Sequence, residues 1–271
     1  MLLIGLLGGC ASPSARVGNP ALPLVIGDTL TIDSAGLGEI RRINVYPPPG
    51  YAESPDASFP VLYLPDGGLA EDFLHVAGLV QVSVGNGTMR PFLLVGIENT
   101  QRRRDMTGPT GNAQDRTIAP LVGGSAGFRA FIRDELMPEI RRRYRTTDET
   151  AIVGESLAGL FVVETFLLEP ELFDTYIAID PSVWWNDGKL IDAAAERLRA
   201  RPGLAKTVYL ANGMDEGGVT ERLAKALAAS APPGVRWHHQ PMSAETHATI
   251  YHPAALLAFR TVFKPQGGAD H

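Results

Sequence analysis

The sequence is short of cysteine, of excess basic charge and of long apolar runs, and each shortage excludes a class of protein. Cys10 is the single cysteine among 271 residues, so no intramolecular disulfide can form. The 24 Lys and Arg are outnumbered by 30 Asp and Glu, and no sustained basic stripe occurs, which argues against binding to nucleic acid. The apolar segment at residues 1–10 is too short to span a bilayer. What remains is the ordinary composition of a globular domain with a sizeable core.

The apolar segment at the start of the chain is typical of an export signal that ends in small residues. With Cys10 at its end it resembles a bacterial lipobox, although no Lys or Arg precedes it; a plain signal peptide or an N-terminal strand is the alternative. This interpretation divides the chain into a lipoprotein-type signal and tether at 1–20, a catalytic domain at 21–265 and a tail at 266–271. It predicts an exported protein, either an outer-membrane lipoprotein that faces the periplasm or a periplasmic protein. A lipid on Cys10 would be its one membrane anchor.

Apolar strands alternate with helical patterns along the rest of the chain. Strands are expected at Phe59–Leu64, Pro91–Ile97, Thr150–Val153, Thr175–Ile179, Lys206–Ala211 and Val235–Pro241. The weakly alternating segments Leu24–Ser34 and Glu39–Tyr46 predict an antiparallel hairpin. Together these patterns predict an α/β protein with a mostly parallel, doubly wound sheet and an antiparallel N-terminal hairpin. The polar stretch 98–124 is expected to be a long loop of the kind that forms lids or binding sites.

The stretch Gly154-Glu155-Ser156-Leu157-Ala158-Gly159 is the most informative in the chain. It joins an apolar strand to an apolar helix, which is the setting of a nucleophile elbow, where a serine is held on a strained turn above a sheet. Ala158 occupies the last position of the G-x-S-x-G pattern, but alanine is still small. The alternative is that Ser156 is an ordinary helix N-cap.

A base and an acid are expected on the loops that follow later strands, because ligands bind outside the carboxyl ends of parallel strands. His247 follows the last strand and is the candidate base that takes the proton of Ser156. Asp215 is the favoured acid and Glu216 the alternative; for either, a solvated turn is the competing interpretation. The order serine, acid, histidine is that of the α/β-hydrolases.

Backbone N–H groups near Ser156 are candidates for an oxyanion hole. Leu157 follows the nucleophile, and the glycines Gly67 and Gly68 follow an earlier strand, where a missing side chain lets a substrate approach the backbone. A plain turn is the alternative for the glycine pair.

Substrate contacts are expected from an aromatic pair and from a basic segment. Trp184 and Trp185 are candidates for a pocket wall, unless one of them packs in the core. Arg104, in the run 102–104, is a candidate for attracting an anionic or catecholate substrate, and a solvated basic turn is the alternative.

With these pieces in place, the chain resembles the putative-esterase group of α/β-hydrolases, which includes esterase D, ferric-enterobactin esterase-like and antigen-85-like proteins. The matching segments, in chain order, are YLPDG at 63–67, VGIENT at 95–100, RRD at 103–105, residues 131–146, GESLAGL at 154–160, DPSVWW at 180–185 and ETH at 245–247. Three positions depart from the family: Glu155 stands where His is common, Ala158 replaces Gly, and Asp180 stands where Ser is common. Some members of the siderophore branch resemble Ser–His dyads, which bears on the role of Asp215.

The resemblance implies a serine carboxylesterase that forms an acyl-enzyme on Ser156 with His247 as base and needs no metal or organic cofactor. Its partner would be a small-molecule ester, with siderophore, carbohydrate-linked and short acyl esters all open. An acyltransferase of the antigen-85 type and a non-catalytic binding lipoprotein on the same fold are the alternatives. The sequence leaves the oligomeric state open.

Overall fold

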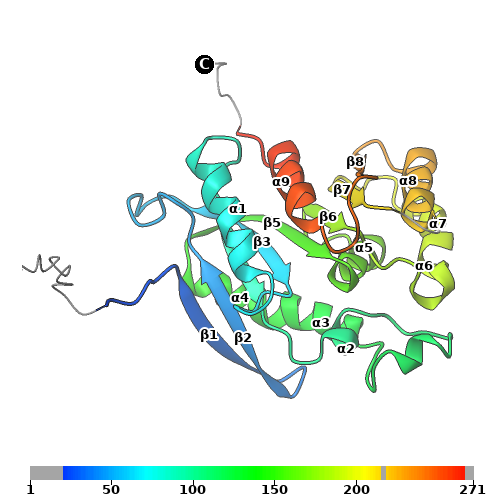
Figure 1. Cartoon of the computed structure of the whole chain (residues 1–271), viewed down its shortest axis with the longest axis horizontal. Coiled ribbons are helices and arrows are strands. Elements are labelled where there is room, and N and C mark those ends of the chain that lie inside the picture. Colours follow the sequence, from blue (N-terminus) through cyan, green and yellow to red (C-terminus); the bar gives the residue numbers. More distant parts are fainter. Residues whose placement is uncertain (1–20, 215–217, 266–271) are drawn as a thin grey trace, which may run out of the picture.

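A single eight-stranded sheet organises the chain in the computed structural model, which describes residues 21–214 and 218–265 (Figure 1). The strand order is β1-β2-β4-β3-β5-β6-β7-β8. The strands are β1 Asp28–Ser34, β2 Glu39–Tyr46, β3 Phe59–Pro65, β4 Leu93–Ile97, β5 Thr146–Glu155, β6 Thr175–Ile179, β7 Thr207–Asn212 and β8 Arg236–Pro241. β2 pairs antiparallel with both β1 and β4, and the remaining pairs are parallel. The predicted α/β fold with an antiparallel N-terminal hairpin is therefore confirmed.

Helices cover both faces of this sheet. They are α1 Phe73–Gly85, α2 Arg102–Asp105, α3 Ser125–Phe131, α4 Met137–Arg143, α5 Leu157–Leu168, α6 Lys189–Asp192, α7 Ala194–Arg199, α8 Val219–Ser230 and α9 Tyr251–Val262. α1 and α9 pack side by side over one face, and α3, α4, α5, α7 and α8 contribute to the core on the other (Figure 1). Every residue of β4, β6 and β7 is buried, which explains why these strands are mostly apolar.

The helical segment after Ser125 is interrupted just before Pro138. A π-helical turn, Ile132–Leu136, lies between α3 and α4. Pro138 has no N–H to donate to the carbonyl four residues earlier, and a wider turn before it avoids the clash with that carbonyl. The segment stays helical, and its apolar side chains remain in the core.

The expected long loop at 98–124 is held in place by side chains from the body of the protein. It contains α2 and a short 3-10 turn, η1 Asp115–Thr117. Arg41 is fully buried and forms ion pairs with Glu39 and with Asp105 of α2. The Trp185 indole N–H donates to the carbonyl of Gly108 at 2.9 Å. These contacts make the loop a folded part of the domain.

We expect Arg41→Met to destabilise the protein by about 2–3 kcal/mol, because the buried Asp105 carboxylate loses one of its two arginine partners and keeps only Arg104. Urea unfolding followed by circular dichroism measures the loss. The control is Arg42→Met: the Arg42 side chain is exposed and lies 3.8 Å from Glu98, so its loss is expected to cost less than about 1 kcal/mol. Equal unfolding midpoints for the two variants would contradict this account.

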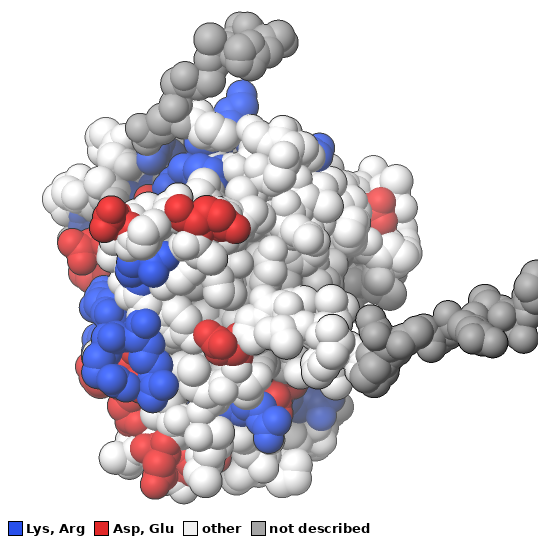
Figure 2. All heavy atoms as spheres, turned by 90° about the vertical axis from the view of Figure 1, so that its left-hand side faces the viewer, with Lys and Arg blue, Asp and Glu red and all other residues white. Residues whose placement is uncertain are grey.

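The surface and the chain ends complete the description. On the face shown in Figure 2, basic side chains gather along one side with acidic side chains among and around them, so this face carries both signs of charge. Within the described residues, no helix is long and apolar enough to cross a membrane. Cys10, the signal and tether at 1–20 and the tail at 266–271 lie outside the described residues.

Candidate active site

Ser156 lies on a sharp turn between the end of β5 and the start of α5, with φ 61° and ψ −120°. Two glycines permit this turn. A Cβ on Gly154 would lie 2.6 Å from the backbone carbon of Ala158, and one on Gly159 would lie 3.0 Å from the carbonyl oxygen of Ile179. Strand and helix therefore approach more closely than side chains at these positions would allow, which is the geometry of a nucleophile elbow.

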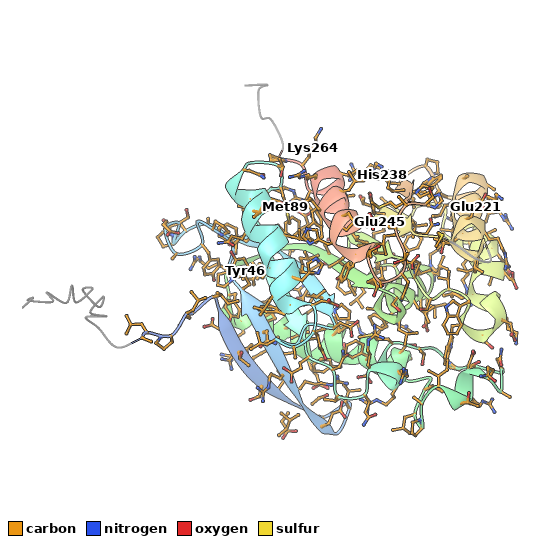
Figure 3. The ribbon with its side chains drawn as sticks, viewed as in Figure 1. Tyr46, Met89, Glu221, His238, Glu245 and Lys264 are labelled. Carbon is orange, nitrogen blue, oxygen red and sulfur yellow. The ribbon has the colours of Figure 1, made fainter. Side chains whose placement is uncertain are left out.

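His247 joins this serine to an aspartate. It lies in the loop between β8 and α9, beyond Glu245, which Figure 3 labels near the start of α9. Its Nε2 is 3.1 Å from Ser156 Oγ, and its Nδ1 is 2.5 Å from Asp180 Oδ2. His238, the labelled histidine on β8, packs instead against Tyr209. Serine, histidine and aspartate thus form one chain of hydrogen bonds.

Asp180 occupies the position for which the sequence favoured Asp215, with Glu216 as the alternative. Both of those acids lie outside the described residues. The register of the sheet explains why Asp180 reaches His247: Glu155 of β5 pairs with Ile179 of β6, so Ser156 and Asp180 leave neighbouring strands side by side. The chain order serine, acid, histidine holds equally for Asp180. Its place directly after the predicted strand Thr175–Ile179 is the feature of the sequence that could have identified it as the acid.

The Asp180 carboxylate is anchored on its second oxygen as well. The backbone N–H of Gly213 donates to Oδ1 at 3.0 Å, while Oδ2 faces His247. A carboxylate held at both oxygens orients the imidazole and fixes which of its nitrogens carries the proton.

The three predicted oxyanion donors have different surroundings. Leu157 is the first residue of α5, so its N–H has no carbonyl partner within that helix. The Gly67 N–H donates to the carbonyl of Ile97 at 2.9 Å and is already engaged, which removes it from the set. The Gly68 N–H donates to Glu71 Oε2 at 2.7 Å, a contact that a developing oxyanion would have to replace.

Of the two tryptophans expected to contact substrate, one lines a hollow beside His247 and the other does not. Trp184 is 49% exposed and lines a hollow of about 580 Å³ beside His247, together with Val183, Met214 and Val219. Trp185 is buried and holds the 98–124 loop instead of lining the hollow. This corrects the prediction that both indoles form its wall.

Arg104 does not reach this hollow, because its guanidinium is paired with Glu39 and Asp105, each at 2.7 Å. Arg102, two residues earlier, is close enough to Glu155 to lower its pKa. It binds both oxygens of Asp66 at 2.7 Å and thereby ties the loop after β4 to the loop after β3. The sequence could not distinguish the members of this arginine run.

A second hollow, of about 480 Å³, lies on the other side of His247. Two carboxylates, Asp72 and Glu155, line it together with the half-buried His75 and the exposed His252. The two imidazole rings are stacked with their centroids 5.1 Å apart. Among the described residues, no group of three or more His, Cys, Asp or Glu side chains is arranged to hold a metal ion.

Burial raises the pKa of both carboxylates in this hollow. The pKa of Glu155 is raised to about 7, mainly by burial and further by Asp72 and Asp180, while His247 and Arg102 oppose the shift. The pKa of Asp72 is raised to about 6, mainly by burial and further by Asp66. A carboxylate beside the nucleophile therefore changes charge near neutral pH.

We expect Glu155→Gln to stabilise the protein at pH 8 and to have little effect near pH 4. The folded-state pKa of Glu155 lies above its ordinary value of 4.5, so its contribution to stability is present below pH 4.5 and is lost as the pH rises through about 7. Glutamine removes that loss, worth about 1–2 kcal/mol after solvent screening. Urea unfolding at both pH values measures it, with the exposed Glu53→Gln as control. A stability difference independent of pH would contradict the assignment.

Comparisons with known proteins show which proteins this chain is similar to. The family model described as "Putative esterase" matches residues 34–255. The ferri-bacillibactin esterase BesA of Bacillus subtilis (strain 168) is 30% identical over 242 residues, which are 79% of this chain and 82% of that protein. The iron(III) salmochelin esterase of Escherichia coli O6:H1 is 26% identical, with 83% of this chain and 53% of that protein covered. An IroE-like serine hydrolase from Shewanella oneidensis has a TM-score of 0.77 and 29% identity, covering 88% of this chain and 80% of that one.

Proposed function

Because this chain belongs to the Putative esterase family and is an esterase of the α/β-hydrolase fold, we propose that it acts as a serine carboxylesterase through Ser156, His247 and Asp180. The observation that supports this most directly is the pair of contacts made by His247: Nε2 lies 3.1 Å from Ser156 Oγ, and Nδ1 lies 2.5 Å from Asp180 Oδ2. Asp180 takes the role that the sequence assigned to Asp215.

In the proposed reaction, His247 Nε2 accepts the Ser156 proton as Oγ attacks the ester carbonyl carbon. The imidazolium that forms is stabilised by Asp180 and then donates its proton to the departing alkoxide oxygen. The acyl group stays on Oγ until a water molecule attacks its carbonyl carbon, with His247 accepting the water proton and then returning it to Oγ. In this scheme the Leu157 N–H, and the Gly68 N–H once Glu71 releases it, stabilise the negative charge on the carbonyl oxygen.

We propose siderophore esters as the substrate class, because two relatives are named siderophore esterases and two others are named esterases of iron complexes. The hollow beside Trp184 supports this choice. Its exposed indole and the apolar side chains of Val183 and Val219 offer a face for a flat aromatic group next to His247. Carbohydrate-linked and short acyl esters remain as comparison substrates in the test.

An activity-based probe tests the chemistry independently of the substrate. A fluorophosphonate is expected to label Ser156, as located by mass spectrometry of the digested protein. Cleavage of a ferric catecholate trilactone, followed by liquid chromatography, tests the substrate class. Labelling without trilactone cleavage would retain the esterase and reject the siderophore. The absence of labelling would favour the non-catalytic binding protein.

A further inference from the structure

Glu155 places a second carboxylate against the catalytic histidine. Its Oε1 lies 3.5 Å from His247 Nε2, the same nitrogen that lies 3.1 Å from Ser156 Oγ. Asp180 contacts the opposite nitrogen, Nδ1. The imidazole is therefore flanked by acids on both sides, and one of them shares the nitrogen that exchanges protons with the serine.

The surroundings of Glu155 leave its carboxylate available for a small ligand. In the described part of the chain its one ion-pair contact is with His247, and its side chain is 17% exposed. Arg102 is close enough to lower the pKa of Glu155, but its Nε and Nη2 both donate to Asp66. Glu155 lines the 480 Å³ hollow beside His247, so water reaches it from that side.

The distance between Glu155 Oε1 and His247 Nε2 matches a bridging water. Two atoms 3.5 Å apart can each hydrogen-bond one water oxygen at about 2.8 Å. A neutral Nε2 accepts one hydrogen of that water, and an ionised carboxylate accepts the other. The lone pair of the water is then directed away from both acceptors, next to the oxygen of Ser156 that carries the acyl group.

We propose that Glu155 positions the water that hydrolyses the acyl-enzyme, an inference that rests on the proposed serine-esterase function. The water oxygen forms a bond to the acyl carbon while one of its protons passes to His247 Nε2. The bond from carbon to Ser156 Oγ then breaks, and the proton on Nε2 passes to Oγ. A carboxylic acid leaves, and Glu155 accepts the second water hydrogen as a hydrogen bond throughout, with no net change of its own.

This role makes Glu155 a determinant of hydrolysis over acyl transfer. Water has two O–H bonds and satisfies both acceptors, whereas an alcohol has one O–H and satisfies His247 alone. Removal of Glu155 is therefore expected to slow attack by water on the acyl-enzyme while leaving attack by an alcohol unchanged. The expected effect of losing a hydrogen bond to a charged group is about tenfold or more in rate.

The decisive experiment measures how much of the acyl-enzyme reacts with water and how much reacts with an alcohol. 4-Nitrophenyl butyrate is turned over in buffer with methanol, and the ratio of methyl butyrate to butyrate is determined by gas chromatography. Glu155→Leu, which removes the acceptor, is expected to raise this ratio about tenfold, and Glu155→Gln, which keeps one acceptor oxygen, to raise it less. The control is Asp72→Asn, in the same hollow but without a contact to His247, and its ratio is expected to equal that of the wild type.

The outcomes separate this inference from the esterase assignment. A ratio unchanged in both Glu155 variants, whatever their total rate, would overturn the positioning role, since a merely structural effect slows both acceptors alike. An equal rise in Asp72→Asn would overturn it as well, because general charge removal would then be the cause. Should Glu155→Leu fail to fold, the ratio for Glu155→Gln decides. Turnover that survives Ser156→Ala would reject the esterase mechanism itself.

Discussion

Ser156→Ala is expected to lower the turnover of 4-nitrophenyl butyrate by at least about 10⁴-fold, the largest effect of any single change in this chain. Its hydroxyl is the one group in the described chain placed at 3.1 Å from His247 Nε2, at the turn between β5 and α5. Without it no acyl-enzyme forms, and only the surrounding donors remain to stabilise a direct attack by water. Steady-state release of 4-nitrophenol measures the loss, and circular dichroism checks that the fold is kept.

Ser182→Ala is the matched control for this result. Its Oγ lies 3.5 Å from Ser156 Oγ, so it shares the environment of the nucleophile. Ser182 makes no described contact with His247, and we expect its variant to keep turnover within a few-fold of the wild type. Loss of activity in Ser182→Ala together with retention in Ser156→Ala would reverse the assignment of the nucleophile.

Asp180→Asn is expected to lower kcat by about 10³–10⁴-fold with little change in KM. Its Oδ2 accepts the hydrogen bond from His247 Nδ1 at 2.5 Å. An amide in its place either presents an N–H to that nitrogen, which fixes the wrong tautomer, or presents a neutral oxygen that stabilises the imidazolium less. Because Oδ1 is held by the Gly213 N–H, the substitution is expected to leave the loop in position.

Asp215→Asn distinguishes the two candidate acids. If Asp180 is the acid that supports His247, the Asp215 variant keeps kcat within a few-fold of the wild type. A larger loss in Asp215→Asn than in Asp180→Asn would instead restore the order of preference that the sequence suggested. The comparison uses the same ester and the same pH, so that differences in substrate binding appear in KM and not in kcat.

Local patterns were sufficient for the existence of the strands and for the sharp turn at Ser156. β6 begins and ends at the residues predicted, Thr175 and Ile179, because a strand that is buried on both faces is read from its mostly apolar run. The elbow was recognisable because Gly154 and Gly159 meet steric limits set by adjacent residues and the next strand. Each of these features depends mainly on the spacing of residues that are close in the chain.

The acid, the pocket wall and the surroundings of Glu155 depended on strand order and register. Asp180 comes beside Ser156 only because β5 and β6 are neighbours with Glu155 opposite Ile179. Trp184 and Trp185 are adjacent in the chain, yet one faces the hollow and the other the core, a difference of side-chain direction that composition does not encode.

The sequence by itself determined the α/β architecture, the antiparallel hairpin and the placing of Ser156 and His247 at strand ends, since hydrophobic periodicity and small-residue turns are local properties of the chain. Only the tertiary structure decided that Asp180 reaches His247, that Arg104 is held by Glu39 and Asp105, and that Glu155 lies against the imidazole of His247. Hydrogen bonds and pKa shifts act over a few ångströms. Their partners come from distant segments, 92 residues apart for Glu155 and His247 (247 − 155), and folding alone brings them together.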